Sequence, residues 1–583
     1  MKPNRPKLYL NLYWHMHQPD YRDIVSNEYV LPWTYLHAIK DYSDMAFHLE
    51  ANPAARVTFN FVPILLEQLE DYSQQFKQNN IRDPLLALLV ETNLADISHE
   101  KCHFLVQSCF KSHHEKMLSP FPHYQRLLQL YKLVEPMMGD DQFSYLSVQY
   151  KADLLVWYHL AWCGESLRRT DAVVQALMAK GALFTLADRQ QLFNVIGETI
   201  SQLIPRYKAL MASKQIEIST TPYYHPILPL LLDFKSALDT MPNAPLPEHA
   251  KYAGGQSRAV AHVLSAKKSH AMHFGEKPRG MWPAEGGVSH AALSLMAEHG
   301  VEWTATGQGV LANSLLKSQL SVADKYEYLY QPYRVTDGKH DVLCFFRDDQ
   351  LSDKIGFEYA KLHSSDAVGD FIRTLEHIQQ ANTHENSKVV SVILDGENAW
   401  EYYPYNGYYF LSELYSALAK HADIEMTTFS DMVDLYQSSE YQIKGLSAPV
   451  LPQVAAGSWV YGTFSTWIGS RDKNLAWDLL CAAKKTYDSV RAKGKLDAQQ
   501  LVACERQLAI CEGSDWFWWF GDYNASDSVA SFDKLYRRNL TNLYTLLQRP
   551  VPAVLNESIS VGGDKTDAGG HADAVGTMRR GQA

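Results

Sequence analysis

The chain has 583 residues, of which 46% are hydrophobic and 20% charged, and these proportions are typical of a globular protein. Its formal net charge of −11 disfavours general nucleic-acid binding, which requires basic surfaces. We expect neither a secretory signal nor a membrane span, because no run of about 18 apolar residues occurs. Seven scattered cysteines without a CxxC motif indicate reduced thiols in a cytoplasmic protein.

Residues 8–18 (LYLNLYWHMHQ) alternate in polarity, which predicts a β-strand that ends at Pro19. His15 and His17 fall on one face of this strand, near its end. An H-x-H pair on a strand is a recurrent zinc arrangement, although no further cluster of His, Asp or Cys completes a ligand shell here. Two interpretations therefore stay open: imidazoles that hydrogen-bond a substrate, or a zinc site.

A second strand is predicted at residues 57–62 (VTFNFV). From about residue 83 to residue 207 apolar residues recur at three- and four-residue spacing, which predicts a succession of helices. We interpret residues 83–207 as a helical insertion between the strands of a barrel, with a mainly structural role.

Residues 215–232 (QIEISTTPYYHPILPLLL) predict a strand at 216–219, followed by a loop that three prolines stiffen. Glu217 is the only Asp, Glu, Lys or Arg of this segment, and His225 stands in the loop beside two tyrosines. A rigid loop presents its side chains at low entropic cost, so we expect a sugar-binding wall. The alternative is a stiff connection without a binding role.

Residues 278–289 (PRGMWPAEGGVS) place the carboxylate of Glu285 beside two glycines, after a short strand that ends at Trp282. Glycines allow the backbone and a ligand to approach closely. The alternative is a glycine-rich turn with an exposed glutamate. Further strands are expected at 302–306 and 342–347, and residues 348–354 form a polar segment that we interpret as a lid loop.

Residues 389–394 (VVSVIL) lack polar alternation, which predicts a strand buried on both faces, as in a parallel sheet. Asp395 follows directly and therefore stands at the carboxyl end of the strand, where catalytic residues lie in α/β sheets and barrels. A helix cap or a turn is the alternative role of this aspartate. The last barrel strand is expected at residues 424–427.

Beyond about residue 430 the chain becomes mainly helical, and helices are expected at 473–493, 498–512 and 526–548. Two polar-aromatic segments border them, TFSTWIGSRDKN (463–474) and SDWFWWFGDYNAS (514–526). Such segments can be packing wedges or sugar platforms. Residues 551–583 are expected to be a disordered tail.

Four separate strands carry polar residues at or near their ends: His15 with His17, Glu217, Glu285 and Asp395. This recurrence argues for one shared site at one face of a barrel. Two of these residues, Glu285 and Asp395, are carboxylates with contrasting neighbours. Retaining glycoside hydrolysis requires such a pair, because one acid attacks the anomeric carbon as a carboxylate while the other donates a proton to the leaving oxygen.

Five segments in this order resemble glycoside hydrolase family 57, especially its α-amylase and amylopullulanase-type members: WHMHQP, QIEISTTPYYHPILPLL, GMWPAEGGVS, LDGENAW and TWIGSRDKNLAW. The likeness extends from about residue 7 to about residue 545. It implies an α/β fold with an incomplete, TIM-like (β/α)7 barrel over residues 1–430, and a helical bundle over 431–550 that completes the active site. It also implies a retaining mechanism on α-glucans, with no cofactor and no catalytic metal.

Carried onto this chain, the resemblance makes Glu285 the nucleophile and Asp395 the general acid/base. The substrate-binding residues that we expect are His15, His17, Glu217, His225, Trp282, Trp400, Trp467, Asp515 and Trp519. One segment departs from the family pattern, since Gly521-Asp522-Tyr523-Asn524 stands where Gly-Asp-Asp-His is expected. This difference bears on the sugar subsites and not on the chemistry.

The expected function is therefore retaining hydrolysis of an α-1,4-glucan or maltooligosaccharide, with no nucleic-acid or membrane partner. Glucan transfer and branching would use the same two carboxylates and differ in how water is excluded. Two other classes stay open: a zinc-dependent deacetylase or mannosidase-like hydrolase that uses His15 and His17, and a non-catalytic glucan-binding protein. The sequence does not determine the oligomeric state.

Overall fold

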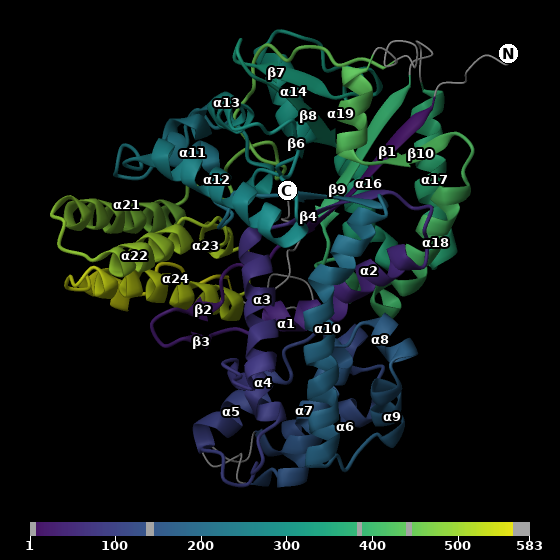
Figure 1. Cartoon of the computed structure of the whole chain (residues 1–583), viewed down its shortest axis with the longest axis vertical. Helices are drawn as coiled ribbons and strands as arrows, with labels where there is room; N and C mark the ends of the chain where they lie inside the picture. Colours follow the sequence, from purple (N-terminus) through teal and green to yellow (C-terminus); the bar gives the residue numbers. More distant parts are fainter. Residues whose placement is uncertain (1–6, 136–144, 382–386, 439–445, 564–583) are drawn as a thin grey trace.

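The computed structural model describes residues 7–135, 145–381, 387–438 and 446–563. Figure 1 shows three parts: a body built around a β-sheet, a helical lobe below it, and a helical bundle at its side. Among the described residues, no helix combines the length and the apolar character that crossing a membrane requires. All seven cysteines are buried and free, in line with the expectation of reduced thiols.

A parallel sheet forms the centre of the body. Its main strands are, in sheet order, β5 (Ile216–Thr220), β4 (Val57–Phe61), β1 (Leu8–Met16), β9 (Lys388–Asp395), β8 (Asp341–Arg347) and β6 (Trp303–Gly307). β10 (Ile424–Thr427) pairs with the amino half of β1, and β4 pairs with its carboxyl half. β7 (Tyr333–Thr336) is antiparallel to β8. The carboxyl ends of the parallel strands therefore lie on one side of the sheet.

Isolated bridges alone connect the two edges of this sheet. Thr220 of β5 bridges to Met281, and Gly280 bridges to Trp303 of β6. The short strand expected at 280–282 is thus present only as these bridges, and no continuous ladder closes a barrel within the described ranges. The prediction of an α/β fold is confirmed, and the arrangement is consistent with an incomplete (β/α)7 barrel.

The alternation of β1 divides the core in two. Leu8, Leu10 and Leu12 face the large core between the sheet and the helices. Tyr9 and Tyr13 face a smaller aromatic core inside the barrel, which also contains Trp282, Trp303 and Phe429. His15 continues this inner face toward the carboxyl end of the strand. The aromatic core therefore supports the polar residues that follow it.

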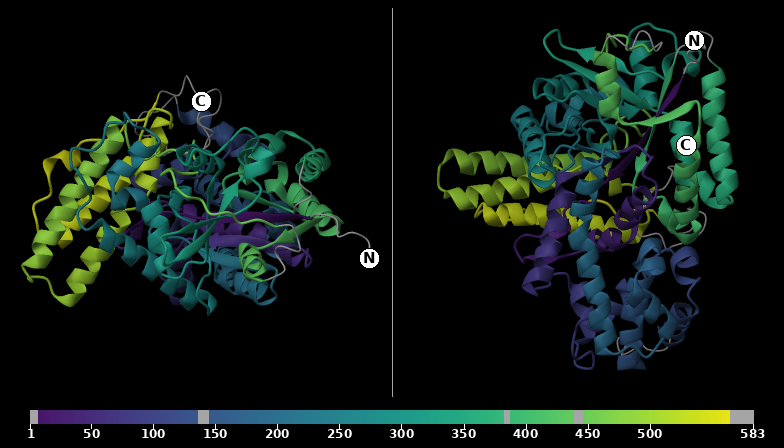
Figure 2. Two further views of the ribbon diagram at one scale, coloured as in Figure 1. Left: turned by 90° about the horizontal axis from the view of Figure 1, so that it is seen from above. Right: turned by 45° about the vertical axis from the view of Figure 1, so that its right-hand side comes forward.

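The helices of the body cover the outside of the sheet (Figures 1 and 2). They are α1 (Trp33–His37), α2 (Ser43–Glu50), α3 (Pro63–Gln78), α11 (Leu228–Leu232), α12 (Gly255–Phe274), α13 (His290–Glu298), α14 (Gln308–Lys317), α15 (Lys325–Tyr328), α16 (Asp349–Asp353), α17 (Ser364–Gln380), α18 (Tyr408–Lys420) and α19 (Phe429–Gln437).

The insertion between β4 and β5 is helical, as its periodicity predicts. It comprises α4 (Pro84–Leu89), α5 (His99–Ser108), α6 (Pro122–Val134), α7 (Val148–Trp162), α8 (Glu165–Thr170), α9 (Ala172–Lys180) and α10 (Leu186–Ala212). α10 is 27 residues long and returns the chain from the lobe to the sheet. This explains how such a long insertion leaves β4 and β5 adjacent.

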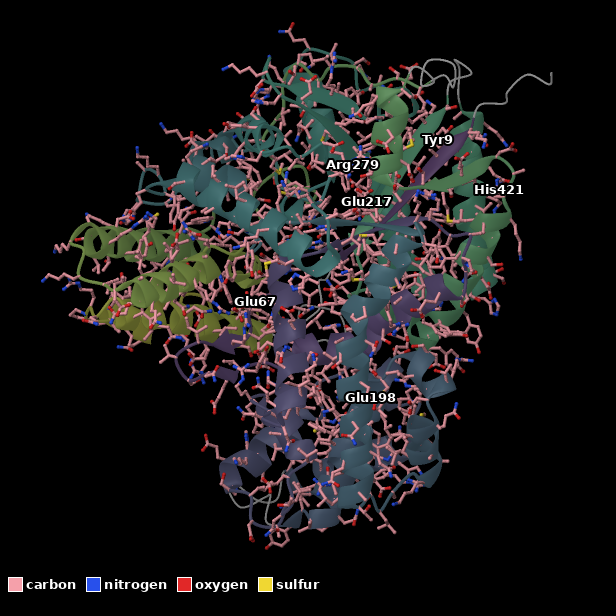
Figure 3. The ribbon with its side chains drawn as sticks, in the orientation of Figure 1. Tyr9, Glu67, Glu198, Glu217, Arg279 and His421 are labelled. Carbon is pink, nitrogen blue, oxygen red and sulfur yellow. The ribbon has the colours of Figure 1, made fainter. Side chains whose placement is uncertain are left out.

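The bundle contains α21 (Arg471–Ala492), α22 (Ala498–Cys511), α23 (Asp515–Trp519) and α24 (Ser526–Leu546). It lies beside the amino end of α3, where Glu67 forms an ion pair with Arg506 of α22 (Figure 3). A buried ion pair between Glu512, which follows α22, and Arg258 of α12 gives a second attachment. The bundle is thus fixed to the body by charged side chains.

Two expectations about irregular segments are wrong. The polar segment 348–354 is helical, because the Asp348 side chain caps α16 by accepting a hydrogen bond from the Leu351 amide at 2.9 Å. Residues 551–563 are ordered, because Leu555 is buried and the Ile559 amide donates to Asp533 Oδ1 at 2.8 Å. The remainder of the expected tail, 564–583, lies outside the described residues.

Candidate active site

Polar side chains converge at the carboxyl ends of β1, β4 and β9. His15 of β1 is in register with Asp395 of β9 on one side and with Asn60 of β4 on the other. The ring Nδ1–H of His15 donates to Asn60 Oδ1 at 2.6 Å, which fixes the orientation of the ring. The first and the last of the predicted strand-end motifs therefore meet at one place, as expected for catalytic residues of parallel sheets.

Three imidazole rings, those of His15, His17 and His225, form a histidine cluster at this place. The ring centroids of His17 and His225 are 3.9 Å apart, and those of His15 and His225 are 5.2 Å apart. Burial lowers the pKa of His15 to about 3, with the charge of His17 adding to the effect. Burial also lowers the pKa of His225 well below its ordinary value. His15 and His225 are therefore neutral at physiological pH.

Two residues of the bundle, Ser514 and Asp515, contact the histidine cluster. His17 Nε2 lies 2.8 Å from Asp515 Oδ1, and His225 Nδ1 donates to Ser514 Oγ at 2.8 Å. The Ser514 hydroxyl in turn donates to Glu285 Oε1 at 3.1 Å. A chain of hydrogen bonds therefore connects His225 to Glu285 through Ser514, so the site is shared between the barrel and the bundle.

The backbone of Glu285 adopts a left-handed conformation, with φ 57° and ψ 26°. A non-glycine residue in this region carries strain of about 1–3 kcal/mol, which the surroundings must offset. The Trp459 amide donates to the Glu285 carbonyl at 3.2 Å, and the Thr306 hydroxyl of β6 donates to the carbonyl of Gly286. The turn is thus held from two sides, and Glu285 is only 3% exposed.

The electrostatic surroundings raise the pKa values of both candidate catalytic carboxyls. Burial raises the pKa of Glu285 well above its ordinary value, and the charges of Asp515 and Asp395 raise it further. Burial raises the pKa of Asp395 to about 6, although a hydrogen bond from Asn398 Nδ2 at 2.8 Å opposes the increase. Because the charge of Asp395 acts on Glu285, the two groups are electrostatically coupled, and each ionises more readily when the other is protonated.

Such a site is suited to acid–base and nucleophilic chemistry. A carboxyl with a pKa of about 6 can donate a proton near neutral pH and accept it again later. The neutral imidazoles of His15 and His225 provide uncharged hydrogen-bonding groups. Among the described residues, His17 Nδ1 and His225 Nε2 are buried without a hydrogen-bond partner. Such atoms are costly to leave unpaired and are suited to bind hydroxyl groups.

Trp282 lies at the floor of this site. Its ring centroid is 6.0 Å from that of His15 and 5.2 Å from that of Trp459. The indole is fully buried, and its Nε1 atom has no hydrogen-bond partner within the described part of the chain. The predicted residues that the structure brings together are therefore His15, His17, His225, Trp282, Glu285, Asp395 and Asp515.

Glu217 does not join this group, contrary to the expectation that it lines the site. It is the second residue of β5, near the amino end of the strand. Its carboxylate accepts hydrogen bonds from Trp303 Nε1 at 2.8 Å and from the Ser430 amide at 2.9 Å. The guanidinium of Arg279, which Figure 3 also labels, pairs with Asp434 of the same helix α19. Glu217 therefore attaches α19 to the barrel.

Three of the predicted sugar-binding tryptophans are packing residues. Trp400 donates from Nε1 to the Gly396 carbonyl at 2.7 Å and packs edge-on against Trp14. Trp467 is fully buried, and its carbonyl accepts a hydrogen bond from the indole of Trp477. Trp519 stacks on Phe532 of α24 with ring centroids 4.4 Å apart. Aromatic character alone did not distinguish these packing residues from sugar-binding ones, because such rings also form cores.

The structure replaces the His15 and His17 pair of the zinc interpretation by a different set of possible ligands. His17, His225 and Asp515 offer donor atoms that all lie within 4.8 Å of one another. His15 is not part of this trio, and its Nδ1 atom is bound to Asn60. In the trio, His17 Nε2 already contacts Asp515, and His225 Nδ1 already donates to Ser514. A metal at this place would have to displace these hydrogen bonds or use the opposite ring nitrogens.

Sequence reasoning missed four residues that contact the site. Asn60 is the one residue with a side-chain amide in the strand VTFNFV, so the sequence could have indicated it as a site residue. Glu397 lies in the same motif as Asp395, is buried, and accepts a hydrogen bond from the His17 amide at 3.2 Å. Ser514 and Trp459 carry no local signal, because their role depends on contacts with a glutamate that is remote in the sequence.

An open depression of about 670 Å³ lies elsewhere, on the outer layer of helices. Residues of α17 and α18 line it, among them Val368, Ile372 and Ala417. None of the residues of the candidate active site takes part in it. We therefore assign the chemistry to the strand ends and not to this depression.

Known proteins share a family profile and a fold with this chain. The sequence profile described as Glycosyl hydrolase family 57 matches residues 11–448. A search of curated proteins found no match. A GH57-type branching enzyme from Pyrococcus horikoshii has a similar structure, at 14% identity and a TM-score of 0.57, over 92% of this chain and 89% of that chain. The α-amylase AmyC from Thermotoga maritima is similar at 14% identity and a TM-score of 0.53, over 93% of both chains.

At these identities the similar structures establish a shared fold. The family profile goes further, because it spans well over half of the chain and contains His15, Glu285 and Asp395. The chain is therefore an enzyme that belongs to glycosyl hydrolase family 57.

Proposed function

We propose that this enzyme hydrolyses α-1,4-glucans with retention of configuration, with Glu285 as the nucleophile and Asp395 as the general acid/base. The observation that supports this proposal most strongly is the placement of the two carboxyls at one site. Asp395 ends β9 in register with His15, and Glu285 is connected through Ser514 to His225, whose ring centroid is 5.2 Å from that of His15. Two carboxyls with different surroundings allow one to act as a base or nucleophile and the other as an acid.

In the first step an ionised Glu285 oxygen attacks the anomeric carbon, and the glycosidic C–O bond breaks. Asp395 gives its proton to the leaving oxygen, so a covalent glucosyl-enzyme forms and the shortened chain is released. In the second step Asp395 takes a proton from water, which attacks the anomeric carbon and frees Glu285. The raised pKa of Asp395, about 6, supports its role in both proton transfers.

We infer that the histidine cluster holds the reacting sugar. His17 Nδ1 and His225 Nε2 are buried without partners among the described residues, and we assign them to hydroxyl groups of the glucose at the site. Asp515 fixes the ring of His17, and Ser514 fixes that of His225. Because both residues come from the bundle, we expect the bundle to control substrate orientation.

The substrate class is supported by the similar structures, which are named a branching enzyme and an α-amylase. Both names indicate α-glucans. Hydrolysis and glucan transfer share the first step and differ in whether water or a sugar hydroxyl attacks the intermediate. The two activities give different products and can be separated directly.

A product analysis on maltoheptaose tests the proposal. Hydrolysis predicts shorter sugars and new reducing ends, and the first product released has the α configuration. Transfer predicts longer and shorter sugars at a constant number of reducing ends. Glu285→Gln should abolish either activity, whereas Glu425→Gln should retain it, because Glu425 of β10 forms a surface ion pair with Lys7. Full activity of Glu285→Gln would refute the proposal.

Dialysis against a chelator tests the zinc-dependent alternative. We expect unchanged activity, because the proposed steps use only carboxyl groups and water. A loss of activity that zinc restores would instead assign the trio His17, His225 and Asp515 to a catalytic metal. Retained maltoheptaose binding without any turnover would favour a non-catalytic glucan-binding protein.

A further inference from the structure

Two tyrosines are exposed on the surface next to the buried Glu285. The exposed fractions are 58% for Tyr461 and 48% for Tyr523, against 3% for Glu285. Tyr461 lies in the loop that joins the barrel to the bundle, and Tyr523 lies in the turn after α23. Neither takes part in the proposed chemistry. The loop of Tyr461 contacts the turn of Glu285, and the segment of Tyr523 also contains Asp515.

The loop of Tyr461 is attached to the turn of the nucleophile. Val288 and Gly457 exchange two backbone hydrogen bonds, of 2.8 and 3.0 Å, and the Trp459 amide donates to the Glu285 carbonyl. Tyr461 itself has a φ of 57°, a strained value for an aromatic residue, and Gly462 follows at 68°. A Cβ atom on Gly462 would approach the Gly309 carbonyl carbon to 2.8 Å, so close packing against α14 fixes this conformation.

The turn of Tyr523 is attached to α23, the five-residue helix that begins with Asp515. Asn524 Nδ2 donates to the carbonyls of Trp518 and Trp519 at 3.0 and 3.1 Å, and the Tyr523 hydroxyl donates to the Trp518 carbonyl at 2.7 Å. A helix of this length spans roughly 7.5 Å at 1.5 Å per residue. Tyr523 is thus held about one and a half helical turns from the residue that contacts His17.

Lys473 of α21 fixes the ring of Tyr523. Its Nζ atom donates to the Tyr523 hydroxyl at 2.9 Å and lies 4.7 Å from the ring centroid. Lys473 is only 2% exposed, so the tyrosine covers a cation that burial would otherwise penalise. An aromatic ring that is both exposed and fixed in place loses little entropy on binding a ligand.

Electrostatics relate both tyrosines to the site. Burial of the phenol raises the pKa of Tyr523, and the charges of Asp522, Tyr461 and Glu285 raise it further. Tyr523 is therefore within electrostatic reach of both Tyr461 and Glu285. It also stands at the position where the family pattern noted in the sequence analysis has an aspartate.

We propose that Tyr461 and Tyr523 bind glucose units next to the reacting one and thereby set the preference of the enzyme for longer chains. This inference rests on the proposed function. Aromatic rings bind the apolar faces of pyranose rings, whereas the buried histidine cluster offers hydrogen bonds to a single sugar. The occupant is an α-glucan chain, because both tyrosines are attached to the segments that hold Glu285 and Asp515.

Steady-state kinetics of Tyr461→Ala, Tyr523→Ala and the double variant test the proposal on maltoheptaose and on α-glucosyl fluoride. The fluoride occupies only the reacting position and does not reach neighbouring subsites. An aromatic contact contributes about 0.5–1.5 kcal/mol, so each single variant should raise KM for maltoheptaose roughly 2- to 10-fold. The rate on the fluoride should remain within about 2-fold of wild type.

Tyr405→Ala and Tyr409→Ala are matched controls. These tyrosines have similar exposed fractions, 58% and 43%, but Tyr405 lies in the turn before α18 and Tyr409 in its first turn, where Arg169 contacts Tyr409. We expect them to leave both substrates unaffected. Tyr523→Phe should retain most of the preference for maltoheptaose, because it keeps the ring and loses only the hydroxyl contact with Lys473.

Two results would overturn the inference. In the first, the alanine variants keep the wild-type ratio of KM values for the two substrates. In the second, activity falls equally on both substrates, which would assign the tyrosines a purely structural role. Failure of the proposed function is a separate result, because it would appear as undiminished turnover by Glu285→Gln.

Discussion

Replacement of Glu512 by glutamine is expected to loosen the bundle from the barrel and to lower activity. Glu512 is fully buried at the end of α22, and its carboxylate accepts hydrogen bonds from Arg258 Nε at 2.8 Å and His262 Nε2 at 2.7 Å. Two residues later the chain reaches Ser514, which contacts Glu285. His262 also accepts a hydrogen bond at its carbonyl from the Tyr223 amide, close to His225. The buried group of Glu512, Arg258 and His262 therefore supports both the segment of Ser514 and the loop of His225.

The magnitude follows from the ionisation of this carboxyl. Burial alone would raise its pKa, but the Arg258 guanidinium and the hydrogen bond from His262 outweigh burial and lower the pKa from 4.5 to about 2. At 1.36 kcal/mol per pKa unit, this difference corresponds to about 3 kcal/mol of stability. Because the folded-state pKa is the lower one, this contribution is present above about pH 4.5 and is lost as the pH falls toward 2.

Urea denaturation at pH 7, followed by tryptophan fluorescence, measures the effect. Glu512→Gln should lose about 3–5 kcal/mol, because it leaves the Arg258 charge buried without its main partner. Glu505→Gln is the matched control on the same helix, since Glu505 contacts Arg258 at 3.3 Å but has a side chain that is 47% exposed. It should lose less than about 1 kcal/mol. Similar losses in the two variants, or a loss by Glu512→Gln that persists unchanged at pH 2, would refute the reasoning.

The acid–base residues give three further predictions. Asp395→Asn should lower kcat/KM on maltoheptaose by about 10²–10⁴-fold, and kcat/KM on α-glucosyl fluoride much less, because the fluoride leaving group needs little proton donation in the first step; equal losses of kcat/KM would contradict a role as general acid. Asn398→Ala should move the high-pH limb of kcat/KM upward from about pH 6, because the removed hydrogen bond favours the ionised form of Asp395; an unmoved or lowered limb would contradict the assignment. Ser514→Ala should move the low-pH limb upward, because the serine hydroxyl favours the ionised form of Glu285, which must be ionised to attack; a pH profile identical to that of wild type would argue against this role.

The strands and the two acids were predictable because their signals are local. The alternation in residues 8–16 and the apolar run before Asp395 specify strands and the ends from which catalytic side chains project. The histidine cluster was predictable only in part. His15 and His17 share a strand, but the stacking of His17 on His225 depends on how the loop after β5 folds back over the site.

The misassigned residues are those whose contacts depend on tertiary packing and not on the local sequence. Glu217 follows the start of β5 and not its end, and one polar residue in a short strand does not reveal which end of the barrel it faces. Trp519 and Trp400 are aromatic residues in catalytic-looking motifs, but their rings complete cores with Phe532 and Trp14. Ser514 contacts a glutamate 229 residues away, and only tertiary packing brings these two together.

Trapping of the covalent intermediate tests the central claim most directly. In Asp395→Asn, α-glucosyl fluoride can still react with Glu285, while the second step lacks its base, so a glucosyl-enzyme should accumulate. Intact-mass measurement and peptide mapping are then expected to show one added glucosyl unit on the peptide that contains Glu285. The variant Glu285→Gln, treated in the same way, should show no added glucosyl unit. An adduct on another residue, or a product of inverted configuration formed without any adduct, would contradict the account.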